Sequence, residues 1–482
     1  MVQSHLKVSG WCDARPLVPR LQSVCADVSA AEEAVVEASR DWWPLAMHWT
    51  LAGEVPSPAS VVCRPADAAE VAAVVALCNT ERVPVTVAAG RSGVCGASVP
   101  VFGGVVLDVT ALRGIVAVDD TSLVADVGAG TFGHHLEADL RAQHGVTLGH
   151  WPQSIELSTV GGWLACRSAG QYSTRYGKIE DIVVGLDVVL ADGSTVTTGG
   201  FPRQAAGPDL TQLFVGSEGT LGVITGARLR VHPLPPAEWR ASFGFTSFAA
   251  GIDACRRILR RGATPAVMRL YDGAESARSY GGDGARCVLL VLDEADDALI
   301  AATRRVVEDE CADAARLDAA LVDAWMEHRN DVSALDALTR KGYVVDTMEI
   351  SAPWVRLPEI YDATVAALLA VPDCRVATAH LSHSYRDGAC IYFTFAATPP
   401  ADAIDATYVA LWDVGTGTVL AHGGSLSHHH GVGLNRARFV AEALGPAAGV
   451  LARVKAALDP SGILNPGKLA LASSFGEVRW PG

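Results

Sequence analysis

The chain has 482 residues, of which 50% are hydrophobic and 19% are charged. This composition excludes a disordered protein and predicts two or three domains, while the net charge of −15 disfavours nucleic acid as a partner, because a phosphate-binding surface needs a basic field. The eleven cysteines include no CxxC pair and are typical of buried thiols in a reducing compartment.

The first 54 residues predict a helical segment, with one helix over about 30–39. From residue 55 the pattern changes to alternating strands and helices. Asp67, followed by Glu70 three residues later, predicts a capping box at the start of a helix over 71–80. Further along we expect a helix over 134–143 and strands over 60–64, 83–88, 104–108, 122–127 and 182–190.

The loop AGRSGVCGA at 89–97 follows the strand at 83–88 directly. Its three glycines within seven residues leave room for backbone N–H groups to approach a phosphate. The loop has neither the GK[ST] of a Walker loop nor a GxGxxG turn, so by itself it identifies no ligand.

Two further blocks in this region are rich in glycine. The stretch at 149–170 contains Ser158-Thr159-Val160-Gly161-Gly162, and paired glycines let N–H groups approach a bulky ligand because no Cβ stands in the way. The alternative is a tight turn before a buried helix. The block at 213–225 surrounds the carboxylate of Glu218 with glycines at 216, 219 and 222, and such a turn can wrap a flat polar ligand with backbone donors.

The run Pro233-Leu234-Pro235-Pro236 marks a domain boundary, because prolines end helices and central strands. We therefore expect one domain at 55–236, a second α/β domain at 237–425 and a C-terminal segment at 426–482. Within the second domain we expect helices over 248–261 and 293–316, and strands over 287–292 and 389–396.

The second domain carries polar residues in distinctive contexts. Arg269 has apolar neighbours, Arg356 follows a Pro-Trp turn, and Tyr385 lies in a turn before a buried strand. Structural roles are the alternatives, namely buried ion pairs for the arginines and a strand cap for the tyrosine.

Three consecutive histidines, His428, His429 and His430, stand between glycines. A surface polar run is the structural alternative for them. A metal site would need a further ligand such as His380 or His383, because three neighbouring side chains cannot all face one ion.

In combination, the blocks at 83–97, 152–162 and 216–225 resemble the FAD-binding domain of the vanillyl-alcohol oxidase and p-cresol methylhydroxylase superfamily. This resemblance implies an α+β fold, in which a two-subdomain FAD-binding domain is joined to an α/β substrate (cap) domain and to a helical C-terminal segment that closes over the flavin. Val94 stands where superfamily members that tether flavin through histidine often carry it, which favours noncovalent FAD and leaves Cys95 and Cys166 open as attachment points. The cofactor-binding residues implied by the resemblance are Ala89, Gly90, Arg91, Ser92, Gly93, Val94, Pro152, Ser154, Ser158, Thr159, Gly161, Gly162, Ser168, Gly170, Tyr176, Glu218, Gly219, Gly222, Val223, Ile224, Asn465 and Lys468.

Four motifs, RLYD at 269–272, SAPWVR at 351–356, DGACIYF at 387–393 and SHHHGVG at 427–433, resemble one branch, the alkylglycerone-phosphate synthases. The resemblance implies an FAD-dependent transferase that exchanges an acyl for an alkyl group on a phosphorylated ketone, through an adduct on flavin N5 and without net redox change. The NPGKL at 465–469 is shared more broadly with glycolate and D-lactate dehydrogenases. An FAD-dependent oxidase or dehydrogenase of a hydroxy acid or alcohol is therefore the alternative, and a non-enzymatic flavin scaffold is a third.

The branch resemblance also implies roles for the catalytic candidates. Tyr385 would be the base, with a pKa lowered by nearby cations. Arg269 and Arg356 would bind ketone or phosphate oxygens. The histidines would hold the leaving carboxylate or relay protons.

The expected partners follow from the same observations. We expect a small-molecule substrate, a phosphorylated ketone or a lipid, and a homodimer. No apolar run is long enough to span a bilayer, and the first ten residues lack the apolar core of a signal peptide. We therefore expect a cytoplasmic protein whose contact with membranes, if any, is peripheral.

Overall fold

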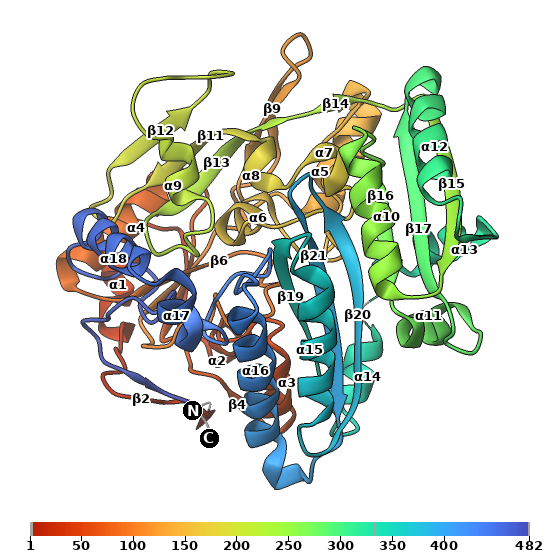
Figure 1. The fold of residues 1–482 in the computed structure, drawn as a ribbon. Coiled ribbons are helices and arrows are strands. Elements are labelled where there is room, and N and C mark those ends of the chain that lie inside the picture. Colours follow the sequence, from red (N-terminus) through yellow and green to blue (C-terminus); the bar gives the residue numbers. More distant parts are fainter. Residues whose placement is uncertain (1–2, 332, 481–482) are drawn as a thin grey trace.

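The computed structural model describes residues 3–331 and 333–480 and shows an α+β fold with three main sheets (Figure 1). Two of these sheets come from the first half of the chain and the third from the second half. The last part of the chain returns to pack on the first half, so that β2 (Lys7–Val8) pairs with β22 (Val478–Arg479). The predicted fold class is confirmed.

The four-stranded sheet positions the first glycine-rich loop. Its strand order is β3 (Asp27–Ser29), β5 (Val61–Arg64), β7 (Val105–Asp108) and β6 (Val85–Ala88), and only β3 runs antiparallel to its neighbour. The buried valines of β5, β6 and β7 pack against α4 (Ala68–Glu81) and the N-terminal segment. Because β5, β6 and β7 are parallel, the loop after β6 leaves at the carboxyl edge of the sheet, where ligands bind in open α/β sheets.

The start of α4 and the N-terminal segment differ in detail from the prediction. The carboxylate of Asp67 accepts hydrogen bonds from the N–H groups of Ala69 and Glu70, so Asp67 caps the helix, which begins at Ala68. The predicted capping box is incomplete, because the Glu70 carboxylate accepts from the N–H of Ala66 and not from that of Asp67. The first 54 residues contain the expected helix as α2 (Glu32–Ala38), but they are not only helical. They also supply β3, whose Val28 pairs with Cys63 of β5.

The five-stranded sheet is antiparallel throughout. Its strand order is β12 (Thr195–Gly199), β11 (Val183–Val189), β13 (Val223–Arg230), β9 (Val124–Gly128) and β8 (Ile115–Asp119). One face packs on α5 (Gly133–Asp139) and α6 (Val160–Cys166), where Trp163 and Leu164 lie in an apolar cluster with strand residues.

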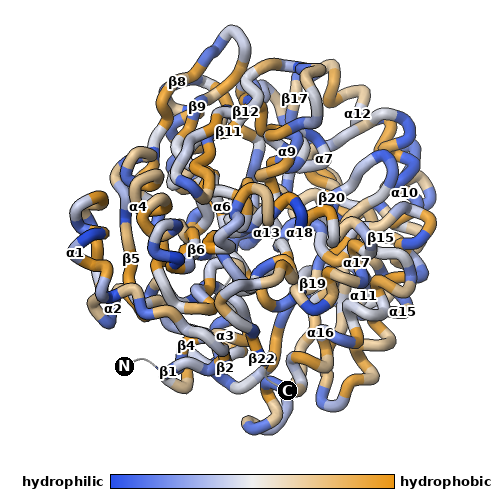
Figure 2. Tube along the Cα trace, turned by 90° about the vertical axis from the view of Figure 1, so that its left-hand side faces the viewer, coloured by the Kyte–Doolittle hydropathy of each residue, from blue (hydrophilic) through white to orange (hydrophobic). Residues whose placement is uncertain are grey.

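The seven-stranded sheet forms most of the second half. Its strand order is β18 (Ala315–Leu317), β15 (Ala237–Phe245), β17 (Cys287–Ala295), β16 (Val267–Tyr271), β20 (Cys374–Ser384), β21 (Gly388–Ala397) and β19 (Val344–Pro353). Four longer helices pack against it, namely α10 (Phe248–Arg260), α12 (Asp297–Glu310), α15 (Leu357–Leu369) and α16 (Ile404–Ala421). Figure 2 shows hydrophobic and hydrophilic residues alternating along the outer helices α10 and α12, as expected for helices with one buried face.

The predicted helix over 293–316 is wrong at both ends. β17 continues to Ala295, and α12 begins only at Asp297. Asp296 is the N-cap of α12, and its side chain accepts a hydrogen bond from the Ala298 N–H. The polar pair Asp293-Glu294 does not open a helix, because both side chains are buried against the first half of the chain. There they bind the Arg175 guanidinium and the Tyr176 hydroxyl.

Shorter elements complete the fold. The remaining helices in the described residues are α1 (Val18–Leu21), α3 (Pro44–Leu51), α7 (Ser173–Tyr176), α8 (Ile179–Ile182), α9 (Leu210–Phe214), α11 (Gly273–Tyr280), α13 (Ala320–His328), α14 (Ser333–Thr339), α17 (Val440–Leu444) and α18 (Ala447–Leu458), with 3-10 turns at Arg15–Leu17, Ala401–Ala403 and Ala437–Phe439 and a π-helical turn at Leu140–His144. The remaining short strands are β1 (Gln3–Ser4), β4 (Glu54–Val55), β10 (Val146–Thr147) and β14 (His232–Pro233). Across these residues, no helix has both the length and the apolar character needed to cross a bilayer.

Candidate active site

The loop at 89–97 presents a row of free backbone donors. Its carbonyl groups at Gly93 and Cys95 accept hydrogen bonds from residues outside the loop. Trp42 N–H donates to Gly93 O, and the N–H groups of Leu434 and Asn435 donate to Cys95 O. In contrast, none of the N–H groups from Gly90 to Cys95 donates to another group of the described residues. The loop is therefore fixed in place with its amides available for an anion.

Gly90 is required by the close packing of this loop. A Cβ at position 90 would lie 2.0 Å from the carbonyl oxygen of Leu157. Arg91 next to it has a positive φ of 52°, and its guanidinium binds Asp108 at 3.0 Å and Glu37 at 2.9 Å. The charge of Arg91 is thus balanced within the protein, which leaves the backbone amides as the loop's free donors.

The structure corrects the expected donors in the second block. Gly161 N–H donates to Ala129 O at 2.7 Å, and Gly162 N–H donates to Oγ1 of Thr159, the N-cap of α6, at 3.3 Å. A Cβ at Gly161 would lie 3.0 Å from Ala129, so this glycine serves close packing. The paired glycines lie in the first turn of α6, and their N–H groups are bonded within the protein.

Polar side chains of the same block are also bonded within the protein. Ser158 Oγ donates to the carbonyl of Ser154, two residues after Pro152, and accepts from the Trp163 indole at 2.7 Å. Ser168 Oγ lies 3.3 Å from His150 Nε2. A Cβ at Gly170 would lie 2.5 Å from the Trp151 nitrogen. These contacts hold the backbone of the block in place. Contacts between the block and a cofactor would be additional to them.

Glu218 joins the third block to the C-terminal segment. Its carboxylate accepts hydrogen bonds from the N–H groups of Val432 and Gly433, at 2.5 and 2.9 Å. Asn465 Nδ2 donates to the carbonyls of both Ala97 and Glu218, at 3.0 and 2.6 Å. The first loop, the third block and the C-terminal segment are therefore joined around Glu218, and burial raises the pKa of its carboxylate.

The other members of the third block have structural positions. Gly219 has a positive φ of 72° in the turn. Gly222, Val223 and Ile224 lead into and form the start of β13, where a Cβ at Gly222 would lie 2.5 Å from Val188. Lys468 is buried and donates to the carbonyl of Val99 at 2.7 Å, and burial lowers its pKa to about 7.

The histidine run forms a turn that a buried carboxylate holds in place. Glu349 of β19 accepts hydrogen bonds from the Ser427 hydroxyl at 2.6 Å and from the N–H groups of His429 and His430, at 2.9 and 2.7 Å. It also binds the fully buried Arg436. Burial opposes the ionisation of Glu349, but the Arg436 guanidinium outweighs burial and holds the pKa of Glu349 below the usual range.

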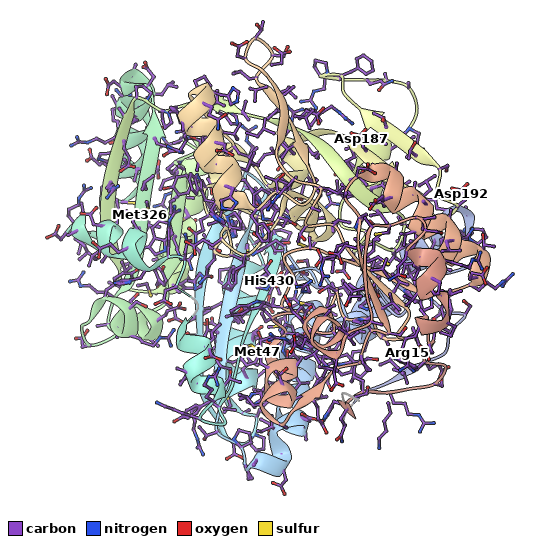
Figure 3. The ribbon with its side chains drawn as sticks, turned by 180° about the vertical axis from the view of Figure 1, so that it is seen from behind. Arg15, Met47, Asp187, Asp192, Met326 and His430 are labelled. Carbon is purple, nitrogen blue, oxygen red and sulfur yellow. The ribbon has the colours of Figure 1, made fainter. Side chains whose placement is uncertain are left out.

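A continuous chain of hydrogen bonds runs through these histidines. Tyr385 Oη lies 2.7 Å from His428 Nε2, and His428 Nδ1 lies 2.8 Å from His429 Nδ1. The hydroxyl of Tyr392 then lies 2.6 Å from His429 Nε2 and 3.1 Å from His430 Nε2. Figure 3 shows His430 near the middle of the molecule.

The protons of this chain have two consistent arrangements. Burial lowers the pKa values of His428, His429 and His430, so the rings are neutral and each carries one N–H. Every link is satisfied when all donors point from Tyr385 toward His430, and equally when all point the other way. Such a chain can pass a proton along its length.

Tyr385 itself departs from expectation. It lies in the β20–β21 turn, as predicted, with its N–H donating to Gly388 O at 2.8 Å. However, burial raises its pKa above the usual value, whereas we expected nearby cations to lower it. The expected lowering of the Tyr385 pKa is therefore wrong, and the acceptor for its proton in the structure is Nε2 of His428.

Arg269 enters the same region from β16. Its Nε donates to the Tyr271 hydroxyl and its Nη2 to His380 Nε2, both at 2.6 Å. His380 Nδ1 lies 2.9 Å from Glu275, and the His380 ring stacks on Tyr392 at 5.0 Å. Arg269 Nη1 has no hydrogen-bond partner among residues 3–331 and 333–480, so it remains available to a ligand.

Arg356 and Tyr176 lie elsewhere. Arg356 is 56% exposed at the start of α15 and pairs loosely with Glu359, so the structure does not bring it to the histidines. The Pro-Trp turn before it places Trp354 inward and Arg356 outward. Tyr176 donates its hydroxyl to Glu294 at 2.6 Å, which joins the two halves of the chain.

Comparison with known proteins now identifies the family. The first half matches a family model described as FAD binding domain over residues 59–199, and the second half matches FAD linked oxidases, C-terminal domain, over residues 234–469. An uncharacterized FAD-linked oxidoreductase of Escherichia coli K12, YgcU, is 32% identical over 438 residues, which cover 86% of this chain and 89% of that protein. The chain belongs to the FAD-linked oxidases.

The chain also resembles proteins with named activities. The alkyldihydroxyacetonephosphate synthase of Dictyostelium discoideum is 30% identical over 454 residues, covering 86% of this chain and 74% of the synthase. A solved alkyldihydroxyacetonephosphate synthase superposes with a TM-score of 0.80 at 26% identity, covering 96% of this chain and 87% of that one. p-Cresol methylhydroxylase shares the fold, with a TM-score of 0.74 at 17% identity over 96% of this chain and 99% of that one.

FAD is the cofactor of this family member, and the first loop fits it. The free N–H groups from Gly90 to Cys95, with Ser92, Gly93 and Val94 partly or fully exposed, are the donor set that a pyrophosphate requires.

Burial raises the pKa of Cys95 well above its usual value and that of Cys166 to about 12. Neither thiol is therefore activated for covalent attachment.

Several important residues escaped the sequence analysis. Glu349, Arg436, Tyr392 and Lys178, whose Nζ donates to His428 O at 2.6 Å, all shape the histidine turn. Glu349 and Arg436 are unremarkable in sequence, and only their joint burial reveals them. The available signal was the DGACIYF motif at 387–393, which contains Tyr392.

Proposed function

We propose that the protein is a transferase of the alkylglycerone-phosphate synthase type, which exchanges an acyl for an alkyl group on a phosphorylated ketone without net redox change. When bound, FAD supplies an electron-accepting isoalloxazine ring. The observation that carries the proposal is the hydrogen-bonded chain from Tyr385 to His430. The 30% identity to a named synthase supports it.

Tyr385 is the proposed base. Its oxygen takes a proton from the substrate carbon while its own hydroxyl proton passes to His428 Nε2. His428 then releases its Nδ1 proton to His429 Nδ1, and the transfer continues through Tyr392 to His430. General base catalysis of this kind contributes about 10²–10⁴-fold to a rate.

The far end of the chain favours a reaction that returns the proton. His430 Nδ1 lies 3.6 Å from Glu349, whose side chain is fully buried with Arg436. A proton that reaches this end is stored near a buried carboxylate and can travel back along the same bonds. An exchange in which a carbon-bound proton is removed and later restored needs such a return.

Arg269 is the proposed binder of a substrate oxygen. Its Nε and Nη2 are fixed by Tyr271 and His380, so the free Nη1 is held in one direction. A guanidinium fixed in this way can orient a ketone or phosphate oxygen at little entropic cost. Arg356 has no part in this proposal.

A second candidate function is an FAD-dependent dehydrogenase or oxidase of a hydroxy acid or alcohol. The specific observation in its favour is the 32% identity to an FAD-linked oxidoreductase. Similarity to a glycolate oxidase subunit of Bacillus subtilis, at 26% over 423 residues, points the same way.

One experiment separates the two functions. The FAD-loaded protein is incubated without oxygen or an electron acceptor, with an acylated phosphoketone and a fatty alcohol, and the ether product is measured. We expect product to form, and we expect hydroxy acids to leave the flavin absorbance unchanged. Bleaching of the flavin by a hydroxy acid, with turnover on addition of a dye acceptor, would replace the proposal with the second candidate.

A further inference from the structure

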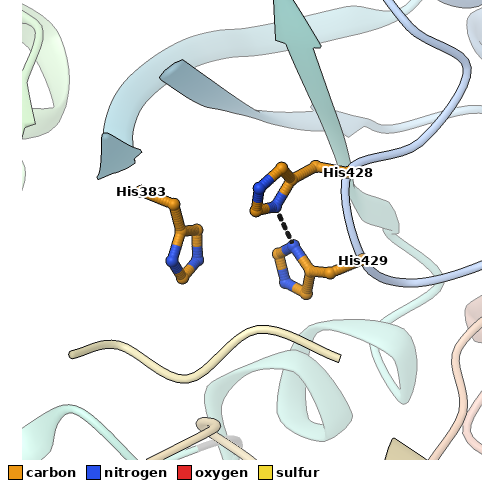
Figure 4. A group of neighbouring side chains, drawn as sticks. All are labelled: His383, His428 and His429. Carbon is orange, nitrogen blue, oxygen red and sulfur yellow. Dashed lines mark hydrogen bonds between the residues drawn. The ribbon is translucent and has the colours of Figure 1, made fainter. Parts of the chain in front are cut away.

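Three buried imidazoles face one another from two different segments. His383 lies near the end of β20, and His428 and His429 lie in the turn that follows α16. One ring nitrogen of each lies within 4.8 Å of the others. Figure 4 shows the rings around a common centre, with the hydrogen bond between His428 and His429 drawn.

The outer nitrogen of each ring is held by a hydroxyl group. Ser173 Oγ lies 2.7 Å from His383 Nδ1, Tyr385 Oη lies 2.7 Å from His428 Nε2, and Tyr392 Oη lies 2.6 Å from His429 Nε2. The inward nitrogens are therefore His383 Nε2, His428 Nδ1 and His429 Nδ1. A hydrogen bond to the outer nitrogen is what orients histidine ligands in metal sites.

We propose that these three imidazoles bind a divalent transition metal, with Zn²⁺ as the matching ion, and that the bound metal switches off proton transfer from Tyr385. The second half of the proposal rests on the proposed function, and the first half does not. Imidazole nitrogens suit Zn²⁺ and not Mg²⁺ or Ca²⁺. Three protein ligands would leave a fourth position open, as in many zinc enzymes.

The required movement is small. At Zn–N distances of about 2.0–2.1 Å, tetrahedral ligand nitrogens lie about 3.3 Å apart. The 2.8 Å pair of His428 and His429 would open slightly, and His383 would approach from within 4.8 Å. Side-chain rotation provides both changes, since the anchoring hydroxyls lie at the outer nitrogens.

The inhibition follows from the tautomers. A metal on both Nδ1 atoms places the remaining proton of His428 and of His429 on Nε2. His428 Nε2–H then donates to Tyr385 and cannot accept its proton, and the direct link between the two Nδ1 atoms is lost. No net proton is released, because the Nδ1 proton of one ring is replaced by a proton on its Nε2.

The test uses the FAD-loaded protein and Zn²⁺ alone. Calorimetric titration should show one tight site per chain, and Zn²⁺ should abolish the ether-forming activity until EDTA is added. His383→Asn keeps a polar group near Ser173 but removes the inward nitrogen. This variant should weaken Zn²⁺ binding by about tenfold or more. It should be active, because His383 is not part of the Tyr385–His430 chain, and it should keep that activity in the presence of Zn²⁺.

Two further variants keep the result decisive. His135→Asn changes an exposed histidine and should bind Zn²⁺ like the wild type. Ser173→Ala should weaken binding by about 10–100-fold, which provides a second measurement if His383→Asn does not fold. Absence of a tight site, or equal Zn²⁺ affinity in the wild type, His383→Asn and Ser173→Ala, would overturn the metal site. Tight binding without inhibition would overturn only the control of proton transfer.

Discussion

The hydroxyl of Tyr385 lies 2.7 Å from Nε2 of His428, although 43 residues separate them in the sequence. The contact joins the β20–β21 turn to the histidine turn, and Glu349 fixes the latter from β19. A buried phenol with a raised pKa is inert by itself. Beside a neutral imidazole it can give up its proton and act as a base, and this pairing leads to the first prediction.

Tyr385→Phe should lower activity by about 10²–10⁴-fold. The ring remains, so the melting temperature and the FAD content should stay at wild-type values. The matched control is Tyr343→Phe, which removes a phenol hydroxyl at the opposite end of β19 and should leave activity unchanged. If Tyr385→Phe retains full activity, the hydroxyl is structural and the proposed base is wrong.

The histidines should differ in their effects according to their place in the chain of hydrogen bonds. His428→Ala removes the acceptor of the Tyr385 proton, so we expect a loss as large as that of Tyr385→Phe. His430→Ala removes the last link, after Tyr392, and should cost less, because the Tyr385 proton still has His428 as its acceptor. Steady-state rates of the two variants at matched FAD content provide the measurement, and equal losses would contradict a directional relay.

Much of the fold was predictable because it depends on local sequence. The glycine-rich loop after β6, the capped start of α4 and the turn at Tyr385 all follow from residues close in the chain. The helix over 293–316 failed because Asp293 and Glu294 are polar residues buried by partners more than a hundred residues away. Sequence periodicity contains no information about such partners.

The same limit applies to the candidate site. The histidine run and Tyr385 were found because the family motifs carry them. Glu349 and Arg436, which hold the turn, were not found, because a single carboxylate in a strand has no local signature. Arg356 was included because of its motif, yet its side chain faces solvent.

Glu349 and Arg436 should be essential for folding as a pair. Both side chains are fully buried and bonded to each other. Glu349→Gln leaves an uncompensated buried guanidinium, so the free energy of unfolding should fall by about 3–5 kcal/mol. Urea denaturation measures this loss. Asp336→Asn, which breaks the exposed pair with Arg340, is the control and should show no change within error.

Asp41 and Lys468 should make stability depend on pH in opposite directions. Burial raises the pKa of Asp41 to about 7 and lowers that of Lys468 to about 7. Between about pH 4 and 7 the native Asp41 holds a proton that the unfolded chain has lost, so its contribution to stability falls as pH rises. Between about pH 7 and 10 the unfolded Lys468 holds a proton that the native side chain lacks, so its contribution rises with pH.

Two variants separate these contributions. Asp41→Asn should flatten the fall in the free energy of unfolding below pH 7, and Lys468→Met should flatten the rise above it. Urea denaturation across this pH range, with the wild type measured in parallel, tests both. Slopes that match the wild type in both variants would show that these groups ionise normally in the native protein.

The last prediction concerns FAD and the loop at 89–97. The purified protein should be yellow, and acid should release its flavin as FAD, because neither Cys95 nor Cys166 is activated for attachment.

Gly90→Ala places a Cβ 2.0 Å from the Leu157 carbonyl oxygen, so the loop must move and FAD content should drop. Gly417→Ala is the matched control, since a Cβ at this position in α16 meets no atom within 4 Å. Flavin absorbance per chain after gel filtration measures both. Full FAD content in Gly90→Ala would show that the free amides of this loop do not hold the cofactor, and flavin that stays with acid-precipitated protein would contradict noncovalent binding.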